Sequence, residues 1–107
     1  MPRGGDQSAR HRAVVRAVRD AAPSVGWWLV PVGQTSGRVT RPVVSKGFPD
    51  LVGVGERGRF IAVEVKTGSG KLDRYQRSYK DLLESKWAIH LVVSSVDDFL
   101  AQARRGR

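Results

Sequence analysis

The chain has 107 residues, a formal net charge of +9, no cysteine and two histidines. This length suits one domain with a modest core. We therefore expect a single domain over residues 1–107, with flexible basic ends at 1–5 and 104–107. The lack of cysteine excludes disulfides and thiolate metal sites, and two histidines are too few for a zinc cage. The composition remains compatible with a metal ion that prefers oxygen ligands, such as Mg²⁺ or Mn²⁺.

The positive charge favours a polyanionic partner, because each Lys or Arg that meets a phosphate releases condensed counterions. We expect nucleic acid; the alternative is a basic surface that only aids solubility. No apolar run approaches the roughly 20 residues of a membrane span, and the N-terminus "MPRGGDQSARHR" lacks the apolar core of a signal peptide. These features predict a soluble, cytoplasmic protein with no membrane partner.

The first half of the chain predicts one helix followed by three strands. Val14, Val15 and Val18 form an apolar stripe on a first helix that Pro23 closes. The segment "VGWWLVPV" predicts a strand, and residues 33–47 predict a loop or irregular hairpin. The two tryptophans of "VGWWLVPV" point to opposite faces of the strand. We expect both in the core; the alternative is that one of them lies in an interface or stacks on a base. Two further strands, "LVGV" and "FIAVEV", are separated by "GERG".

The second half predicts a helix, a strand and a final helix, which completes the order αβββαβα. Apolar residues repeat at helical spacing from Leu72 through about Ser85, and "WAIHLVV" predicts a strand. Ser95 is placed to cap the final helix, with acidic residues in its first turn and arginines in its last, as the helix dipole prefers. The strands on either side of "GERG" are apolar on both faces, so we expect them to be central and covered on both sides.

The central hairpin contains charges where burial is expected. If residues 56–58 form a three-residue turn with Gly58 in the left-handed conformation, Asp50 lies opposite Glu64. Side chains alternate along a strand, so Lys66 shares the face of Glu64 and the three groups converge at one end of the hairpin. A turn one residue shorter or longer would put Asp50 and Glu64 on opposite faces.

Two adjacent carboxylates repel, and a divalent cation between them makes the arrangement favourable. Such an ion polarises a phosphodiester oxygen and lowers the pKa of a bound water. Lys66 can orient that water or neutralise charge that develops on phosphorus. The structural alternative is a buried ion pair that only stabilises the fold, but buried pairs are weak sources of stability.

These motifs resemble the VRR-NUC branch of the PD-(D/E)xK nucleases. The string "PD", followed by "EVK" after 13 intervening residues counted from Asp50 to Glu64, looks like the superfamily signature. The finer pattern also matches in order: a short first helix, a Trp-rich strand, "TSG", "GFPDLVGV", "GRFIAVEVK", a helix glutamine and "SSVDDFL". The resemblance implies a restriction-endonuclease-like αβββαβ core, with a mixed central sheet flanked by helices and an extra C-terminal helix.

By this resemblance Asp50, Glu64 and the backbone carbonyl of Val65 would bind Mg²⁺ or Mn²⁺, Lys66 would assist the attacking water, and Gln76 would match the family's helix glutamine. Helical spacing independently turns Gln76 inward, where it needs a partner; the alternative is that it caps a backbone group. The family usually carries an early first-helix glutamate, which this chain lacks. Asp6 or Gln7 could stand in for it.

The expected function is a metal-dependent DNA endonuclease that acts as a homodimer on branched DNA such as four-way junctions. The alternatives are a non-catalytic DNA-binding module and a nuclease that depends on other chains. His11, among arginines, is expected at the surface or on a phosphate rather than as a catalytic base. The residues expected to contact DNA are Arg12, Arg16, Ser36, Arg38, Arg41, Lys46, Lys71 and Arg74.

Overall fold

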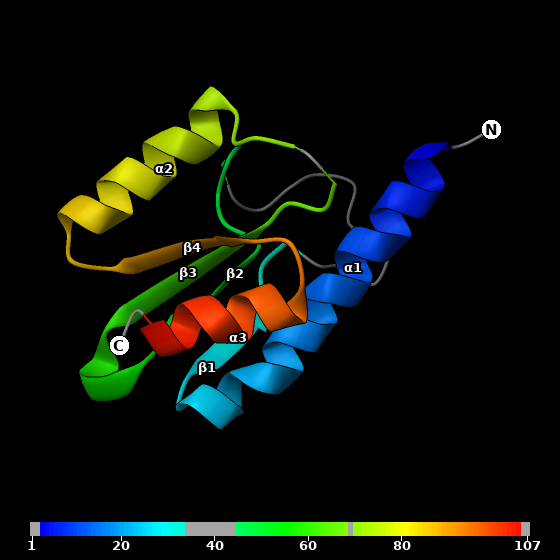
Figure 1. The fold of residues 1–107 in the computed structure, drawn as a ribbon. Helices are drawn as coiled ribbons and strands as arrows, with labels where there is room; N and C mark the ends of the chain where they lie inside the picture. Colours follow the sequence, from blue (N-terminus) through cyan, green and yellow to red (C-terminus); the bar gives the residue numbers. More distant parts are fainter. Residues whose placement is uncertain (1–2, 34–44, 69, 106–107) are drawn as a thin grey trace.

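A computed structural model describes residues 3–33, 45–68 and 70–105, with side chains from residue 9 onward. Its helices and strands follow the predicted order αβββαβα, and two short 3₁₀ helices, η1 and η2, lie between them (Figure 1). In chain order the elements are α1 (Arg3–Ala21), η1 (Ala22–Val25), β1 (Trp28–Pro31), β2 (Leu51–Val54), η2 (Glu56–Gly58), β3 (Phe60–Val65), α2 (Arg74–Ser85), β4 (Ile89–Val93) and α3 (Val96–Arg105).

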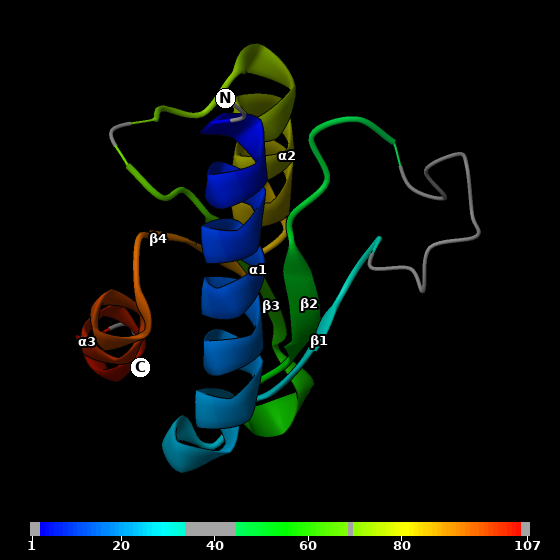
Figure 2. The ribbon, with the colours of Figure 1, turned by 90° about the vertical axis from the view of Figure 1, so that its right-hand side faces the viewer.

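The four strands form one mixed sheet in the order β1-β2-β3-β4. Strands β1 and β3 each run antiparallel to β2, whereas β3 and β4 run parallel. Helices α1 and α3 cover one face, and α2 lies on the other (Figures 1 and 2). The main core fills the space between the sheet and the α1–α3 pair; its largest members include Val15, Val18, Leu51, Ile61, Val63, Val65, Val93 and Phe99. This arrangement confirms the predicted fold class.

Several element boundaries differ from those that the sequence pattern predicts. Helix α1 begins at Arg3, and α3 runs to Arg105, so helical backbone covers part of both ends that we expected to be flexible. Helix α2 begins after Leu72, because the side chain of Asp73 accepts a hydrogen bond from the Gln76 amide and so caps the helix. Among the described residues, no helix combines the length and apolar character that crossing a bilayer requires.

The β2–β3 hairpin has the predicted register. Leu51 pairs with Val63, and Val54 pairs with Phe60. The turn contains Gly58 at φ +75°, as expected, and Arg57 is also left-handed at φ +60°. This register places Asp50, one residue before β2, opposite Glu64 on β3, at the end of the hairpin away from the turn.

The two adjacent tryptophans have different environments. Trp27 is in the core and packs edge-on against Phe99, with ring centroids 5.8 Å apart. Trp28 is 62% exposed, so its expected place in the core is wrong. It pairs with Val54, which pairs with Phe60, so these three side chains form an exposed row across three strands. The expectation that both central strands are covered on both faces is therefore wrong for this end of β2.

A close approach of two backbones holds the segment before β2 against α2. Gly47 has φ +89°, and a Cβ at this position would lie 2.5 Å from the carbonyl carbon of Tyr75. Only glycine fits such a contact without moving the backbone. The contact links the chain that leads to Asp50 with the first turn of α2, where Gln76 lies.

Candidate active site

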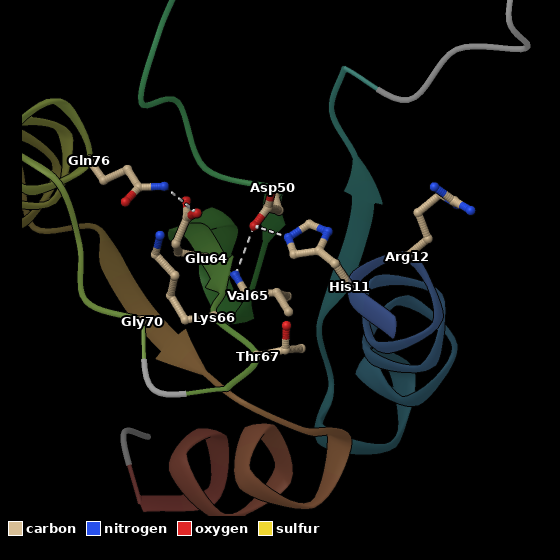
Figure 3. Close-up of a pocket in the computed structure, with 9 residues that line it drawn as sticks. All are labelled: His11, Arg12, Asp50, Glu64, Val65, Lys66, Thr67, Gly70 and Gln76. Atoms are coloured by element: carbon tan, nitrogen blue, oxygen red, sulfur yellow. Dashed lines mark hydrogen bonds and ion pairs between the residues drawn. The ribbon is translucent and has the colours of Figure 1, made fainter. Parts of the chain in front are cut away.

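A pocket of about 480 Å³ opens beside the end of β3 that is nearer to α1 and the start of α2 (Figure 3). It brings together side chains from α1, from the residue before β2, from β3 and the segment after it, and from α2. Its lining consists of His11, Arg12, Asp50, Glu64, Val65, Lys66, Thr67, Gly70 and Gln76. The four residues that the sequence predicts as catalytic therefore line one pocket.

Asp50 is fixed by two contacts. The main-chain amide of Val65 donates a hydrogen bond of 2.8 Å to its Oδ2 atom. His11 Nε2 lies 3.2 Å from the same oxygen (Figure 3). The hydrogen bond with Asp50 and the negative charge of that carboxylate raise the pKa of His11 above its usual range. A protonated His11 is therefore favoured beside this carboxylate.

Glu64 lies on β3 and is only 4% exposed. Its Oε2 accepts a hydrogen bond of 2.8 Å from Gln76 Nε2, whereas its buried Oε1 has no hydrogen-bond partner within the described part of the chain. Burial, and then the negative charge of Asp50, raise the pKa of Glu64 to about 8. The folded, metal-free site thus disfavours the ionised form of this carboxyl group.

Gln76 combines both roles that the sequence suggested for it. Its Nε2 donates to Glu64, while its Oε1 accepts a hydrogen bond of 2.9 Å from the Asp73 amide. The Asp73 side chain accepts in return from the Gln76 amide, which completes a capping box. The start of α2 therefore orients Gln76 toward the carboxylate on β3.

Lys66 follows β3 directly and lines the same pocket as Glu64 (Figure 3). Its main-chain amide donates a hydrogen bond of 2.9 Å to the carbonyl of Val93 at the end of β4, which fixes the backbone from which the side chain projects. The positive charge of Lys66 lowers the pKa of Glu64, opposing the effects of burial and of Asp50. Its charge therefore acts on the Glu64 carboxyl group.

The donor set of the pocket fits a divalent cation of the magnesium type. Within the described residues, no group of three or more His, Asp or Glu side chains is arranged to hold a metal ion. Mg²⁺, however, is commonly bound by one or two carboxylates together with water and substrate phosphates. The unpaired Oε1 of Glu64 and the raised pKa of its carboxyl group suit a cation there. Asp6 and Gln7 belong to α1, but their side chains lie outside the described part.

The residues expected to contact DNA fall into four groups. Arg12 lines the pocket, whereas Arg16 and Lys71 are exposed elsewhere. Lys46 and Arg74 both lie over the ring of Tyr75. Outside the described residues lie Ser36, Arg38 and Arg41.

His11 is the site residue that sequence reasoning misjudged. We expected it at the surface, but it is partly buried and contacts Asp50. The signal was present: His11 precedes Val14, Val15 and Val18 by three, four and seven residues, which places it on the same helix face. We expected a surface position because arginines flank His11 on both sides in the sequence.

The raised pKa of Glu64 predicts how Glu64→Gln changes stability in EDTA. A carboxyl group with a raised folded-state pKa favours folding when protonated, so this contribution is present below about pH 4.5 and is lost as the pH rises through about 8. The variant should match the wild type near pH 4.5 and exceed it by roughly 4 kcal/mol in free energy of unfolding near pH 8, since each pKa unit is worth about 1.36 kcal/mol. Urea denaturation at both pH values measures the difference.

Glu84→Gln is the matched control, because that carboxylate is exposed and pairs with Lys80. Its effect on unfolding should be small at both pH values, because exposed ion pairs contribute little to stability. A Glu64→Gln effect that is the same at both pH values would contradict the assigned environment of Glu64.

Known proteins share both the sequence pattern and the fold. A family model described as "VRR-NUC domain" matches residues 34–97, more than half of the chain, and this range contains Asp50, Glu64, Lys66 and Gln76. A solved structure titled "VRR_NUC domain" is 23% identical, with a TM-score of 0.61 over 90% of this chain and 91% of that chain. Another, "VRR_NUC domain protein", is 14% identical, with a TM-score of 0.59 over 91% and 84%. A comparison with curated proteins found no match. The chain belongs to the VRR-NUC family of the PD-(D/E)xK nuclease superfamily and has its nuclease-type fold.

Proposed function

We propose that the protein is a DNA endonuclease that hydrolyses phosphodiester bonds with Mg²⁺ or Mn²⁺. The observation that carries the proposal is the convergence of Asp50, Glu64 and Lys66 in one pocket. A net charge of +9 supports a nucleic-acid substrate. The deep burial of Glu64 argues against a purely stabilising ion pair, because its carboxylate lacks the full set of partners that such a pair needs.

Each residue has a role that follows from its contacts. Asp50, held by the Val65 amide, and Glu64, held by Gln76, would bind the ion together with the backbone carbonyl of Val65. When bound, the ion would supply Lewis acidity and lower the pKa of a bound water. Lys66 neutralises negative charge that develops on the phosphate as the bond breaks.

We further propose that the protein works as a homodimer on branched DNA. One active site cuts one strand, whereas a junction needs two coordinated cuts, which a two-fold symmetric dimer supplies. The exposed row of Trp28, Val54 and Phe60 supports a protein interface, because monomers rarely expose contiguous apolar side chains. Helix α3 buries its large apolar residue Phe99 in the core, so it offers less apolar surface for an interface than this row does.

A second candidate function is a non-catalytic or partner-dependent DNA-binding module. It is favoured by one observation: within the described residues, no third acidic or histidine side chain completes a metal site with the two carboxylates. Such a module would keep the basic surface and the fold while losing the chemical step.

A labelled panel of linear, flapped and four-way DNA tests these proposals. Cutting should require Mn²⁺ or Mg²⁺, and the four-way DNA should be cut about tenfold faster or more, a difference of about 1.4 kcal/mol in barrier. Sedimentation at micromolar concentration should show a dimer, which Trp28→Ser converts to monomer. Cutting in excess EDTA would contradict the metal requirement, and tight DNA binding without cutting in either ion would select the binding module.

A further inference from the structure

A second pocket, of about 310 Å³, lies between α2 and residues 45–46. It is lined by Ser45, Lys46, Tyr75, Ser78, Tyr79 and Leu82, and we call it the tyrosine pocket. The same two segments, residues 45–50 and α2, contribute to both pockets. Tyr75 lines the tyrosine pocket and its neighbour Gln76 lines the candidate active site. The two pockets are therefore adjacent.

The tyrosine pocket combines aromatic and aliphatic surface with positive charge. Tyr75 is 39% exposed and Leu82 is 50% exposed, which is unusual for two large side chains that line one hollow. Lys46 Nζ lies 4.7 Å and Arg74 Cζ lies 5.0 Å from the centroid of the Tyr75 ring. Apolar surface beside cations suits a ligand with a flat aromatic part and an attached anion.

Packing within the fold holds the walls of this pocket in place. Tyr79 packs edge-on against Phe48, with ring centroids 5.3 Å apart, and its hydroxyl is hydrogen-bonded to Ser45. Gly47 lies directly against the backbone of Tyr75. The pocket is thus pre-formed, as small-ligand sites usually are, and its volume is at the small end of their range.

The distance to the candidate active site limits what the ligand can be. Lys46 precedes Asp50 by four residues, so their Cα atoms lie at most about 14 Å apart. A DNA strand in a duplex rises 3.4 Å per nucleotide, so this span corresponds to about four nucleotides at most. A group in the tyrosine pocket can therefore belong to the same DNA molecule that is being cut.

We propose that the tyrosine pocket binds one unpaired nucleotide close to the scissile phosphate. Its base takes the place of a cation over the Tyr75 ring and lies against Leu82, and the displaced side chain of Lys46 or Arg74 contacts its phosphate. The inference rests on the proposed nuclease function and specifies its substrate class. The bases of an intact duplex are stacked inside the helix, and a base must leave the stack before it can enter a pocket of this size. DNA with unpaired nucleotides beside the cut is therefore preferred.

Binding in EDTA tests this without any cleavage. Two fluorescent DNA duplexes are compared, one fully paired and one with a single unpaired 2-aminopurine at each of several positions in turn. Tyr75→Ala should weaken binding of the unpaired DNA by roughly 5- to 100-fold, as loss of base–aromatic stacking does. It should leave the fully paired DNA within about twofold. Tyr75→Phe should retain the wild-type preference.

Trp87→Ala is the matched control, because it removes an aromatic side chain that is 69% exposed and lies between α2 and β4 rather than in either pocket. Leu82→Ala is a second variant for the case in which Tyr75→Ala fails to fold. It should also reduce the preference for unpaired DNA, because Leu82 lines the same pocket. Equal losses on both DNAs, or no loss in either pocket variant, would overturn this inference alone. A wild-type protein that binds neither DNA would overturn the proposed function as well.

Discussion

Asp50→Asn should lower the rate of DNA cleavage in Mn²⁺ by about a thousandfold or more. Lewis-acid assistance is worth several kcal/mol, and each 1.36 kcal/mol is a factor of ten in rate. The asparagine oxygen can still accept the hydrogen bond from the Val65 amide, so the end of the hairpin should keep its shape. The variant removes the negative charge that attracts a divalent ion. Single-turnover cleavage measures the loss, and Glu64→Gln should show a comparable one.

DNA binding by Asp50→Asn should be unchanged or tighter, because the substitution removes a negative charge that repels phosphate. Fluorescence anisotropy in EDTA measures this separately from the chemistry. Asp81→Asn serves as the matched control: it removes an exposed carboxylate from α2 and should cut normally. Cleavage by Asp50→Asn within tenfold of the wild type would show that the pocket is not the reaction centre.

The hairpin that carries the site could be predicted because local rules determine it. Both strands are apolar on both faces, so the turn fixes the register: a three-residue turn that ends at Gly58, which adopts φ > 0, pairs Val54 with Phe60 and Leu51 with Val63. That register places Asp50 opposite Glu64 before any tertiary contact is known. Gln76 was predictable for a similar reason, since helical spacing turns it toward the sheet.

Other features depend on contacts between distant segments and could not be read in advance. Gly47 and Tyr75 are far apart in the chain, and only the folded backbone shows that they touch and that a second pocket forms beside them. The exposure of Trp28 has the same origin: its neighbour Trp27 fills the core, and α2 packs against β4 rather than over β1. Strand alternation predicts opposite faces but not which face a helix covers.

Lys66→Ala should slow the chemical step by about a hundredfold or more while it leaves Mn²⁺ affinity nearly unchanged. A protonated lysine cannot ligate a cation, so its loss removes no ligand, whereas loss of a preorganised electrostatic stabiliser typically costs 10²–10³ in rate. The positive charge of Lys66 lowers the pKa of Glu64, which is consistent with a charge close to this carboxylate. Single-turnover kinetics and calorimetric Mn²⁺ titration measure the two quantities.

The matched control is Lys71→Ala, which removes an exposed cation outside the residues that line the pocket. It should weaken DNA binding slightly but cut as fast as the wild type at saturating enzyme, because a phosphate contact of this kind contributes to binding and not to the reaction. Lys66→Ala should instead stay slow at saturation. If calorimetry showed that Lys66→Ala loses the ion with its fold intact, the lysine would be organising the carboxylates, and the stabilisation of the developing charge would have to come from another cation of the pocket, Arg12 or a protonated His11.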